Sequence, residues 1–93
     1  MSLRRLKVFQ VVARTGSFTR AAGDLSMTQP AVSFQVKQLE AEVSAQLIDR
    51  STRELKLTHA GERVLSYADR IIALHHEMKT EMASLVKEPM KAR

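Results

Sequence analysis

Hydrophobic residues recur at helical spacing along four stretches of this chain. Apolar positions separated by three and four residues form one face of a helix. They predict helices over residues 3–14, 18–25, 29–43 and 59–87. In the first stretch the buried stripe is predicted to consist of Leu3, Leu6, Phe9, Val12 and Ala13.

Residues that favour helix ends lie between these stretches. Short polar side chains can accept a hydrogen bond from a free backbone N–H at the start of a helix. The predicted N-caps are Ser2, Ser17 and either Thr28 or Gln29. Gly16 fits just past the first helix, where a positive φ is common. Pro30 suits a first helical turn, because an N–H is not needed there.

Between residues 47 and 58 the pattern changes. Leu55 and Leu57 alternate with Lys56, and polar turn residues precede them. Alternation of this kind predicts a short two-stranded wing. An irregular loop is the alternative, because two strands alone are only marginally stable.

The last predicted helix is too long to bury its apolar face against residues 1–58. At about 1.5 Å per residue it spans roughly 40 Å. Its apolar residues step alternately by four and three, which is a heptad pattern that favours pairing with a second copy of the chain. The residues predicted at this dimer interface are Val64, Ala68, Ile71, His75, Met78 and Met82. Pro89 is expected to end the helix.

The expected fold class is therefore mainly α. We predict a winged helix-turn-helix (three helices plus a short two-stranded wing) over residues 1–58, with the helix-turn-helix at 18–37. A linker and dimerisation helix follows at 59–88. Residues 89–93 would form a hinge or tail.

Composition supports one small domain with a polyanionic partner. The chain has 93 residues, no cysteine and a net charge of +5. Nine basic and five acidic residues lie in the first 57 residues, against six and five in the rest. The positive excess therefore accompanies the helix-turn-helix, as expected for binding double-stranded DNA. There is no run of about 18 apolar residues and no signal peptide, so no membrane contact and a cytoplasmic location are expected.

The start of the second helix of the motif should read base edges in the major groove. The candidates are Thr28, Gln29, Pro30, Ser33 and Phe34. Gln29 can pair with adenine, and Pro30 and Phe34 can contact thymine methyls. The alternatives are helix capping for Gln29 and Ser33, and covering of the domain edge for Phe34.

Other polar residues are candidates for the DNA backbone, whose phosphates position a protein without reading sequence. They are Ser17, Thr19, Arg20, Gln35 and Lys37. Arg53, at the wing tip, can enter a narrow minor groove. Its alternative role is that of an ordinary surface arginine.

Neither a metal site nor catalysis is expected. His75 and His76 are adjacent, so they point about 100° apart on a helix. No glycine-rich phosphate loop or nucleophile signature is present. We therefore expect no cofactor and no enzymatic activity.

Five short motifs occur in order. They are Gly16-Ser17-Phe18-Thr19 with Ala21-Ala22, Gln29-Pro30-Ala31-Val32-Ser33, Leu39-Glu40, Leu47-Ile48-Asp49-Arg50 and Leu57-Thr58-His59-Ala60-Gly61. Together they resemble the N-terminal domain of LysR-type transcriptional regulators, from about Leu3 onward. Three positions depart from the family pattern. Relatives usually have Phe at position 48, Gly at position 44 and often a basic residue at position 34.

The resemblance implies a sequence-specific DNA-binding domain that reads an interrupted palindrome as a homodimer. It also implies a longer regulator, in which a small-molecule effector acts only through a C-terminal domain outside this chain. We expect the chain to be a piece of that regulator rather than a stand-alone protein. The alternatives are a helical protein-interaction adaptor and an unrelated winged-helix architectural protein. Steep salt dependence of binding would separate DNA binding from the adaptor.

Overall fold

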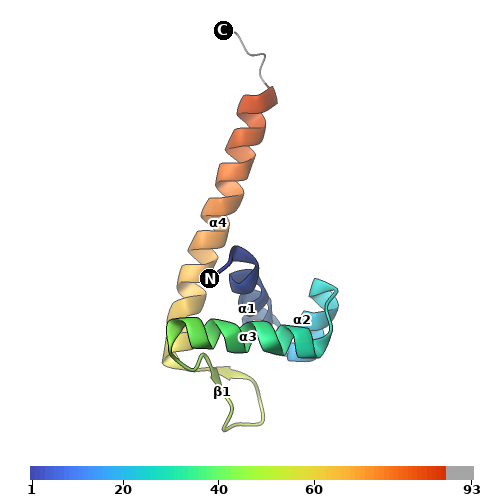
Figure 1. Cartoon of the computed structure of the whole chain (residues 1–93), viewed down its shortest axis with the longest axis vertical. Helices are drawn as coiled ribbons and strands as arrows, with labels where there is room; N and C mark the ends of the chain where they lie inside the picture. Colours follow the sequence, from blue (N-terminus) through green and yellow to red (C-terminus); the bar gives the residue numbers. More distant parts are fainter. Residues whose placement is uncertain (88–93) are drawn as a thin grey trace.

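The predicted order of helices and strands is confirmed in the computed structural model, which describes residues 1–87 (Figure 1). The elements are α1 (Leu3–Thr15), α2 (Phe18–Leu25), α3 (Gln29–Val43), β1 (Ile48–Asp49), β2 (Lys56–Leu57) and α4 (His59–Lys87). The predictions for Pro89 and for the hinge at 89–93 lie outside the described residues.

Three helices begin at the predicted capping residues. Ser2, Ser17 and Thr28 each accept a hydrogen bond, at 3.1–3.2 Å, from the backbone N–H three residues later. Such a bond satisfies one of the free N–H groups at a helix start. At α3 the cap is therefore Thr28, and Gln29 is the first helical residue.

The first three helices end in residues with left-handed backbone conformation. Gly16 has φ 69°, as predicted, while Ser26 and Ser44 have φ 54° and 56°. The N–H groups of Ser26 and Met27 bond back to carbonyls of the last turn of α2, in the pattern of a Schellman motif. Glycine adopts this conformation at low cost, whereas a side chain at Cβ makes it strained.

The core lies where α1, α2 and α3 converge. Its buried hydrophobic residues are Leu6, Val8, Phe9, Val12, Ala21, Ala22, Val32, Val36, Leu39, Leu47, Ile48 and Ala68. Ala68 is fully buried here, against the other helices of its own chain. The prediction that Ala68 belongs to a dimer interface is wrong, because no surface of this residue remains for a partner.

The start of α4 is held against the residue that precedes the wing. The N–H of Thr58 donates to the carbonyl of Leu47 at 3.0 Å, and its hydroxyl accepts from the N–H of Gly61 at 2.9 Å. A Cβ on Gly61 would lie 2.1 Å from the same carbonyl oxygen of Leu47. Only glycine therefore allows this close approach of α4 to the chain before β1.

The wing is a two-stranded antiparallel sheet in which Ile48 pairs with Leu57 and Asp49 with Lys56. The sheet, rather than the irregular loop, is thus confirmed. Ile48 is 3% exposed and belongs to the core.

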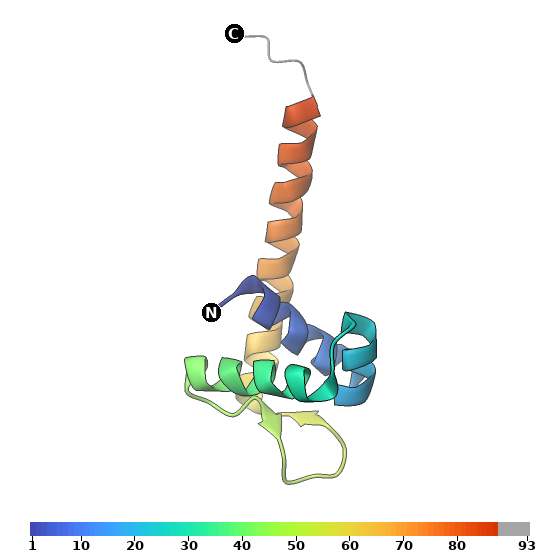
Figure 2. The same ribbon diagram turned by 45° about the vertical axis from the view of Figure 1, so that its right-hand side comes forward.

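The elements place α3 and the wing together at one end of the molecule. In Figure 1, α3 crosses the front, the loop between β1 and β2 projects below it, and α4 rises away from both. The turned view in Figure 2 shows the same arrangement. No helix within residues 1–87 has the length and apolar character needed to cross a membrane.

Candidate nucleic-acid interface

One face of α3 takes no part in the core. Val32, Val36 and Leu39 are fully buried along the opposite face. At about 100° per residue, the positions between them turn outward. Pro30, Phe34 and Lys37 are exposed on this side, while Gln29, seven positions before Val36, is exposed because it lies in the first turn, ahead of the first buried residue of α3. These four exposed residues are called the outward face of α3 below. They include three of the five residues predicted to read bases.

Phe34 is the largest side chain on this face. It is 55% exposed, and it is absent from the partly buried residues that pack on the core. This exposure favours contact with a partner over covering of the domain edge, and the contact of Phe34 with bases stays a prediction. The core can be completed without it because Val32 and Val36, on either side, supply the buried contacts.

Two of the polar candidates on α3, Ser33 and Gln35, are less exposed to solvent than the residues of the outward face. Ser33 is half-buried. Gln35 lies toward α1, where its Oε1 accepts a hydrogen bond from Nε of Arg5 at 2.9 Å. Its amide N–H groups can still donate to a phosphate, and the contact with DNA stays a prediction.

The first turn of α2 presents the other predicted backbone contacts. Thr19 and Arg20 are exposed, and Ser17 is half-buried at the N-cap. Free N–H groups and the helix dipole make a helix start favourable for an anion. Arg20 adds a full charge, so phosphate contact here is physically reasonable.

The loop between β1 and β2 is organised by its own hydrogen bonds. The hydroxyl and N–H of Ser51 donate to Oδ1 of Asp49 at 2.6 and 3.0 Å. These bonds, with the nearby charge of Lys56, hold the pKa of Asp49 below its ordinary value. Arg53 is exposed in this loop, and it forms no salt bridge within residues 1–87. Its guanidinium is therefore available at the tip of the wing.

Glu40 couples α3 to the wing, a role that the sequence did not reveal. Its Oε2 accepts hydrogen bonds from the backbone N–H groups of Leu47 and Ile48 at 2.8 and 3.2 Å. Its Oε1 lies 3.3 Å from Nη2 of Arg50. One carboxylate thus sets where β1 begins relative to α3. The only sequence signal was an acid on the inner side of an amphipathic helix.

Beyond its contact with α1, α4 carries a second apolar face. Ile71, Leu74, Met78, Met82 and Leu85 are 42–62% exposed and are called the exposed stripe below. Val64 packs against the core instead, and His75 lies in a groove with Leu3 and Lys7 of α1. The heptad spacing identified Ile71, Met78 and Met82 but not Leu74, because the predicted seam also ran through Val64, Ala68 and His75, on the side of α4 nearer to α1.

Tyr67, which lies on α4 just before the exposed stripe, was also absent from the residues predicted from the sequence. The guanidinium carbons of Arg63 and Arg70 lie 5.5 and 4.6 Å from the centre of its ring. Arginines at this distance are attracted to the ring face. The signal in the sequence was an aromatic residue three or four positions from a basic one on each side.

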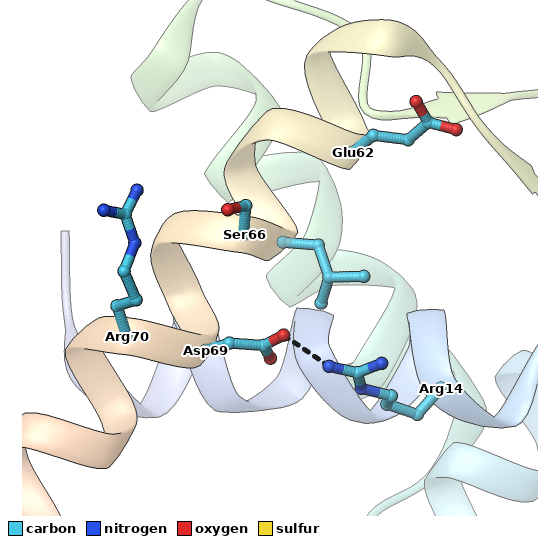
Figure 3. Close-up of a pocket in the computed structure, with 6 residues that line it drawn as sticks. Arg14, Glu62, Ser66, Asp69 and Arg70 are labelled. Carbon is cyan, nitrogen blue, oxygen red and sulfur yellow. Dashed lines mark hydrogen bonds and ion pairs between the residues drawn. The ribbon is translucent and has the colours of Figure 1, made fainter.

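A shallow hollow between α1 and α4 contains an ion pair rather than a reactive site (Figure 3). Nη2 of Arg14 contacts Oδ2 of Asp69. Asp69 also accepts a hydrogen bond from Gln10 at 2.7 Å. In Figure 3 Glu62 lies at a distance from Asp69, on another turn of α4. In the described part of the chain, no three His, Cys, Asp or Glu residues converge as metal ligands would.

The family resemblance is confirmed by comparison with known proteins. Residues 3–62 match the family described as bacterial regulatory helix-turn-helix proteins of the lysR family. The chain is 46% identical over 85 residues to the RuBisCO operon transcriptional regulator of Allochromatium vinosum, covering 91% of this chain and 28% of that protein. It is 51% identical over 72 residues to the HTH-type transcriptional regulator CfxR of Cupriavidus necator, covering 77% and 23%. The chain thus spans about a quarter of the length of these curated relatives.

Solved structures of two related domains with DNA share this fold. The BenM DNA-binding domain in complex with catB site 1 DNA has a TM-score of 0.92 at 32% identity, covering 96% of this chain and all of that one. The CbnR DNA-binding domain in its DNA complex has a TM-score of 0.86 at 34% identity, covering 94% and 100%. The family and its named relatives are transcriptional regulators, not enzymes. The chain therefore belongs to the LysR family of bacterial regulatory helix-turn-helix proteins, and its domain is a winged helix-turn-helix DNA-binding domain.

Proposed function

We propose that this domain binds double-stranded DNA by sequence, with α3 in the major groove and the wing against the minor groove. The observation that carries the proposal is the outward face of α3. Its side chains are exposed and unused by the fold, while the opposite face is fully buried. The major groove admits one α-helix and displays a different pattern of donors, acceptors and methyl groups for each base pair.

Exposed positive charges lie on this face, on α2 and on the wing. Arg20 lies at the start of α2, Lys37 on α3 and Arg53 on the wing. Within residues 1–87 none of the three forms a salt bridge. Each can neutralise a phosphate and release a counterion, which makes the affinity fall with salt. Arg53 at the wing tip suits a narrow minor groove, where the negative potential is stronger.

The exposed stripe of α4 would pair two copies of the chain. Each large apolar side chain that leaves water contributes about 1.5–3 kcal/mol, so five of them favour association. A two-fold dimer presents two copies of α3 to successive major grooves. The preferred site would then be an interrupted palindrome with one half-site for each protomer.

The relatives indicate the wider role. The proteins matched in Allochromatium vinosum and Cupriavidus necator are named transcriptional regulators, and we assign the same role to the regulator that contains this domain. A small-molecule effector would act through a C-terminal domain outside this chain. Bacterial DNA lies in the cytoplasm, so this function requires a cytoplasmic protein.

Selection of bound sequences from a random DNA pool, followed by titration of single-base variants, tests the proposal. Gln29→Ala should lower affinity by about 1–3 kcal/mol and relax the preference at one position of each half-site. Gln46→Ala is the matched control, because Gln46 is exposed but lies outside α3. A pool that yields no preferred sequence would contradict sequence-specific binding.

Titration at several salt concentrations tests the wing. Arg53→Ala should lower the salt slope by about one unit if Arg53 contacts a phosphate. If Arg53 reads the width of the minor groove, the preference for flanking A·T pairs should flatten instead. Arg53→Lys keeps the charge and serves as the control. A salt slope near zero for the wild-type chain would favour the protein-interaction adaptor over DNA binding.

A further inference from the structure

The largest residue of the outward face of α3 is Phe34, and its position points to a particular base contact. The side chain is 55% exposed, on the face of α3 that the proposed function directs into the major groove. A single exposed apolar residue on a protein surface is ordinary. A phenyl ring at this place, however, must meet the edges of base pairs or their backbone when DNA is bound.

The chemistry of the ring limits what Phe34 can recognise. It carries no hydrogen-bond donor or acceptor, so it cannot pair with the edges that distinguish guanine, adenine and cytosine. An arginine or lysine at this position would instead donate to O6 and N7 of guanine. The apolar group that B-DNA displays in the major groove is the 5-methyl group of thymine.

The neighbouring residues favour an apolar contact. Pro30 lies four positions before Phe34, so the two side chains are adjacent on the surface of α3. Both residues are exposed, and the ring of Pro30 is apolar and has no N–H. The polar residues Gln29 and Lys37 extend the face at either end. Pro30 and Phe34 therefore form a small apolar patch between the polar residues Gln29 and Lys37.

We propose that Phe34 makes this domain select a pyrimidine 5-methyl group, normally that of thymine, at one position in each half-site. This inference rests on the proposed function, since it assumes that α3 enters the major groove. It also gives the domain a property that an arginine at this position would not supply. 5-Methylcytosine carries the same methyl group, so cytosine methylation at that position should strengthen binding.

The test uses the 93-residue chain and duplexes obtained by selection from a random pool. Each thymine is replaced in turn by deoxyuridine, which removes only the methyl group. We expect an affinity loss of about fourfold at one position of each half-site, the value for removing one buried methyl-sized group from contact. In the same position, 5-methylcytosine should bind about fourfold more tightly than cytosine.

Variants of Phe34 assign the effect to this side chain. Phe34→Ala should bind thymine and deoxyuridine equally at that position, while preferences at the other positions remain. Phe34→Leu keeps an apolar group and should retain part of the discrimination. Because the ring is outside the core, the midpoint of thermal unfolding should stay unchanged in both variants. That measurement separates loss of recognition from loss of fold.

Two outcomes would overturn the inference while leaving the proposed function intact. One is a selected duplex that is bound tightly but shows no loss with deoxyuridine at any position. The other is a loss that persists unchanged in Phe34→Ala. Failure of the wild-type chain to bind any selected duplex would instead contradict the proposed function itself, and the inference with it.

Discussion

The two ends of α4 contrast sharply, although the helix runs through both without interruption. At its start, Ala68 is fully buried and Val64 and Ile72 pack on the core formed by the first three helices. Farther along, Leu74, Met78 and Leu85 are 62%, 52% and 55% exposed. Both ends have apolar residues at helical spacing. An amphipathic pattern therefore specifies a helix, but it does not specify which surface will cover the apolar face.

The difference arises because α4 carries two apolar faces that point in different directions. Ala68 and Ile72 are four residues apart and pack in the core, at the end of α4 that contacts α1. Measured from Ala68, Ile71 and Leu74 lie about 60° and 120° around the helix at 100° per residue. Only the first face meets the body of the same chain. The second extends past that body, so its burial depends on assembly.

The largest expected effect tests how tightly the start of α4 is built into the body. Gly61→Ala would place a Cβ 2.1 Å from the carbonyl oxygen of Leu47. Because the obstacle is backbone, we expect the free energy of unfolding to fall by about 3 kcal/mol, measured by chemical denaturation. Gly23→Ala is the matched control in α2, where a Cβ meets nothing within 4 Å. It should stabilise the chain by about 0.5–1 kcal/mol, and a similar loss in both variants would contradict the argument.

The next prediction separates the two faces of α4. Leu74→Asp should weaken dimerisation by about tenfold or more, because the dimer would lose an apolar group that it buries and would instead hold a charge at its interface. Ile72→Asp should instead lower the free energy of unfolding, since Ile72 packs on the core. Sedimentation analysis and chemical denaturation measure the two effects.

Ala73→Asp provides the control for this pair. Ala73 is exposed and lies outside the exposed stripe, so neither dimerisation nor stability should change much. A wild-type chain that remains monomeric at tens of micromolar, with α4 still helical, would rule out the exposed stripe as a dimer interface.

A smaller effect is expected at the ion pair between Arg14 of α1 and Asp69 of α4. The side chains are 60% and 34% exposed, so water and salt screen their attraction. A double-mutant cycle with Arg14→Met and Asp69→Asn should give a coupling of less than about 1 kcal/mol. The coupling should weaken further in high salt. A coupling of several kcal/mol would show that this pair, and not the apolar face, holds α4 to the body.

The smallest effect concerns the end of α3, in the body. Ser44 has φ 56°, a conformation that glycine adopts without strain. Ser44→Gly should raise the free energy of unfolding by about 0.5 kcal/mol, since relief of strain exceeds the added entropy of the unfolded chain. Ser66→Gly, in the exposed interior of α4, should lower it by a similar amount. Equal changes in both variants would contradict the assignment of strain to Ser44.

Much of the fold was predictable because local rules decide it. Ser2, Ser17 and Thr28 cap helices through hydrogen bonds that span only three residues. Apolar spacing marked α1 to α4 for the same reason, since neighbours on a helix face are close in sequence. Part of the outward face of α3 could also be predicted from the sequence, because the capping pattern places Gln29 and Pro30 at the start of that helix.

The remaining features depend on residues that are distant in sequence. Arg5 bonds to Gln35 and Glu42 across 30 and 37 positions, and no local pattern reveals such pairs. Ala68 lies on the apolar seam predicted from the sequence, and only packing within the folded chain makes it a core residue rather than a dimer contact. Phe34 has two interpretations in the sequence, and its exposure in the folded chain favours the base contact.

The sequence alone determined the succession of helices, the places where they start and the presence of a DNA-reading motif, because helix periodicity and capping are properties of short segments. The tertiary structure decided which apolar residues became core and which stayed open, how Glu40 sets the wing against α3, and which side of α4 is free. These outcomes follow from how whole elements pack against one another. Burial is a property of the assembled surface rather than of any one residue.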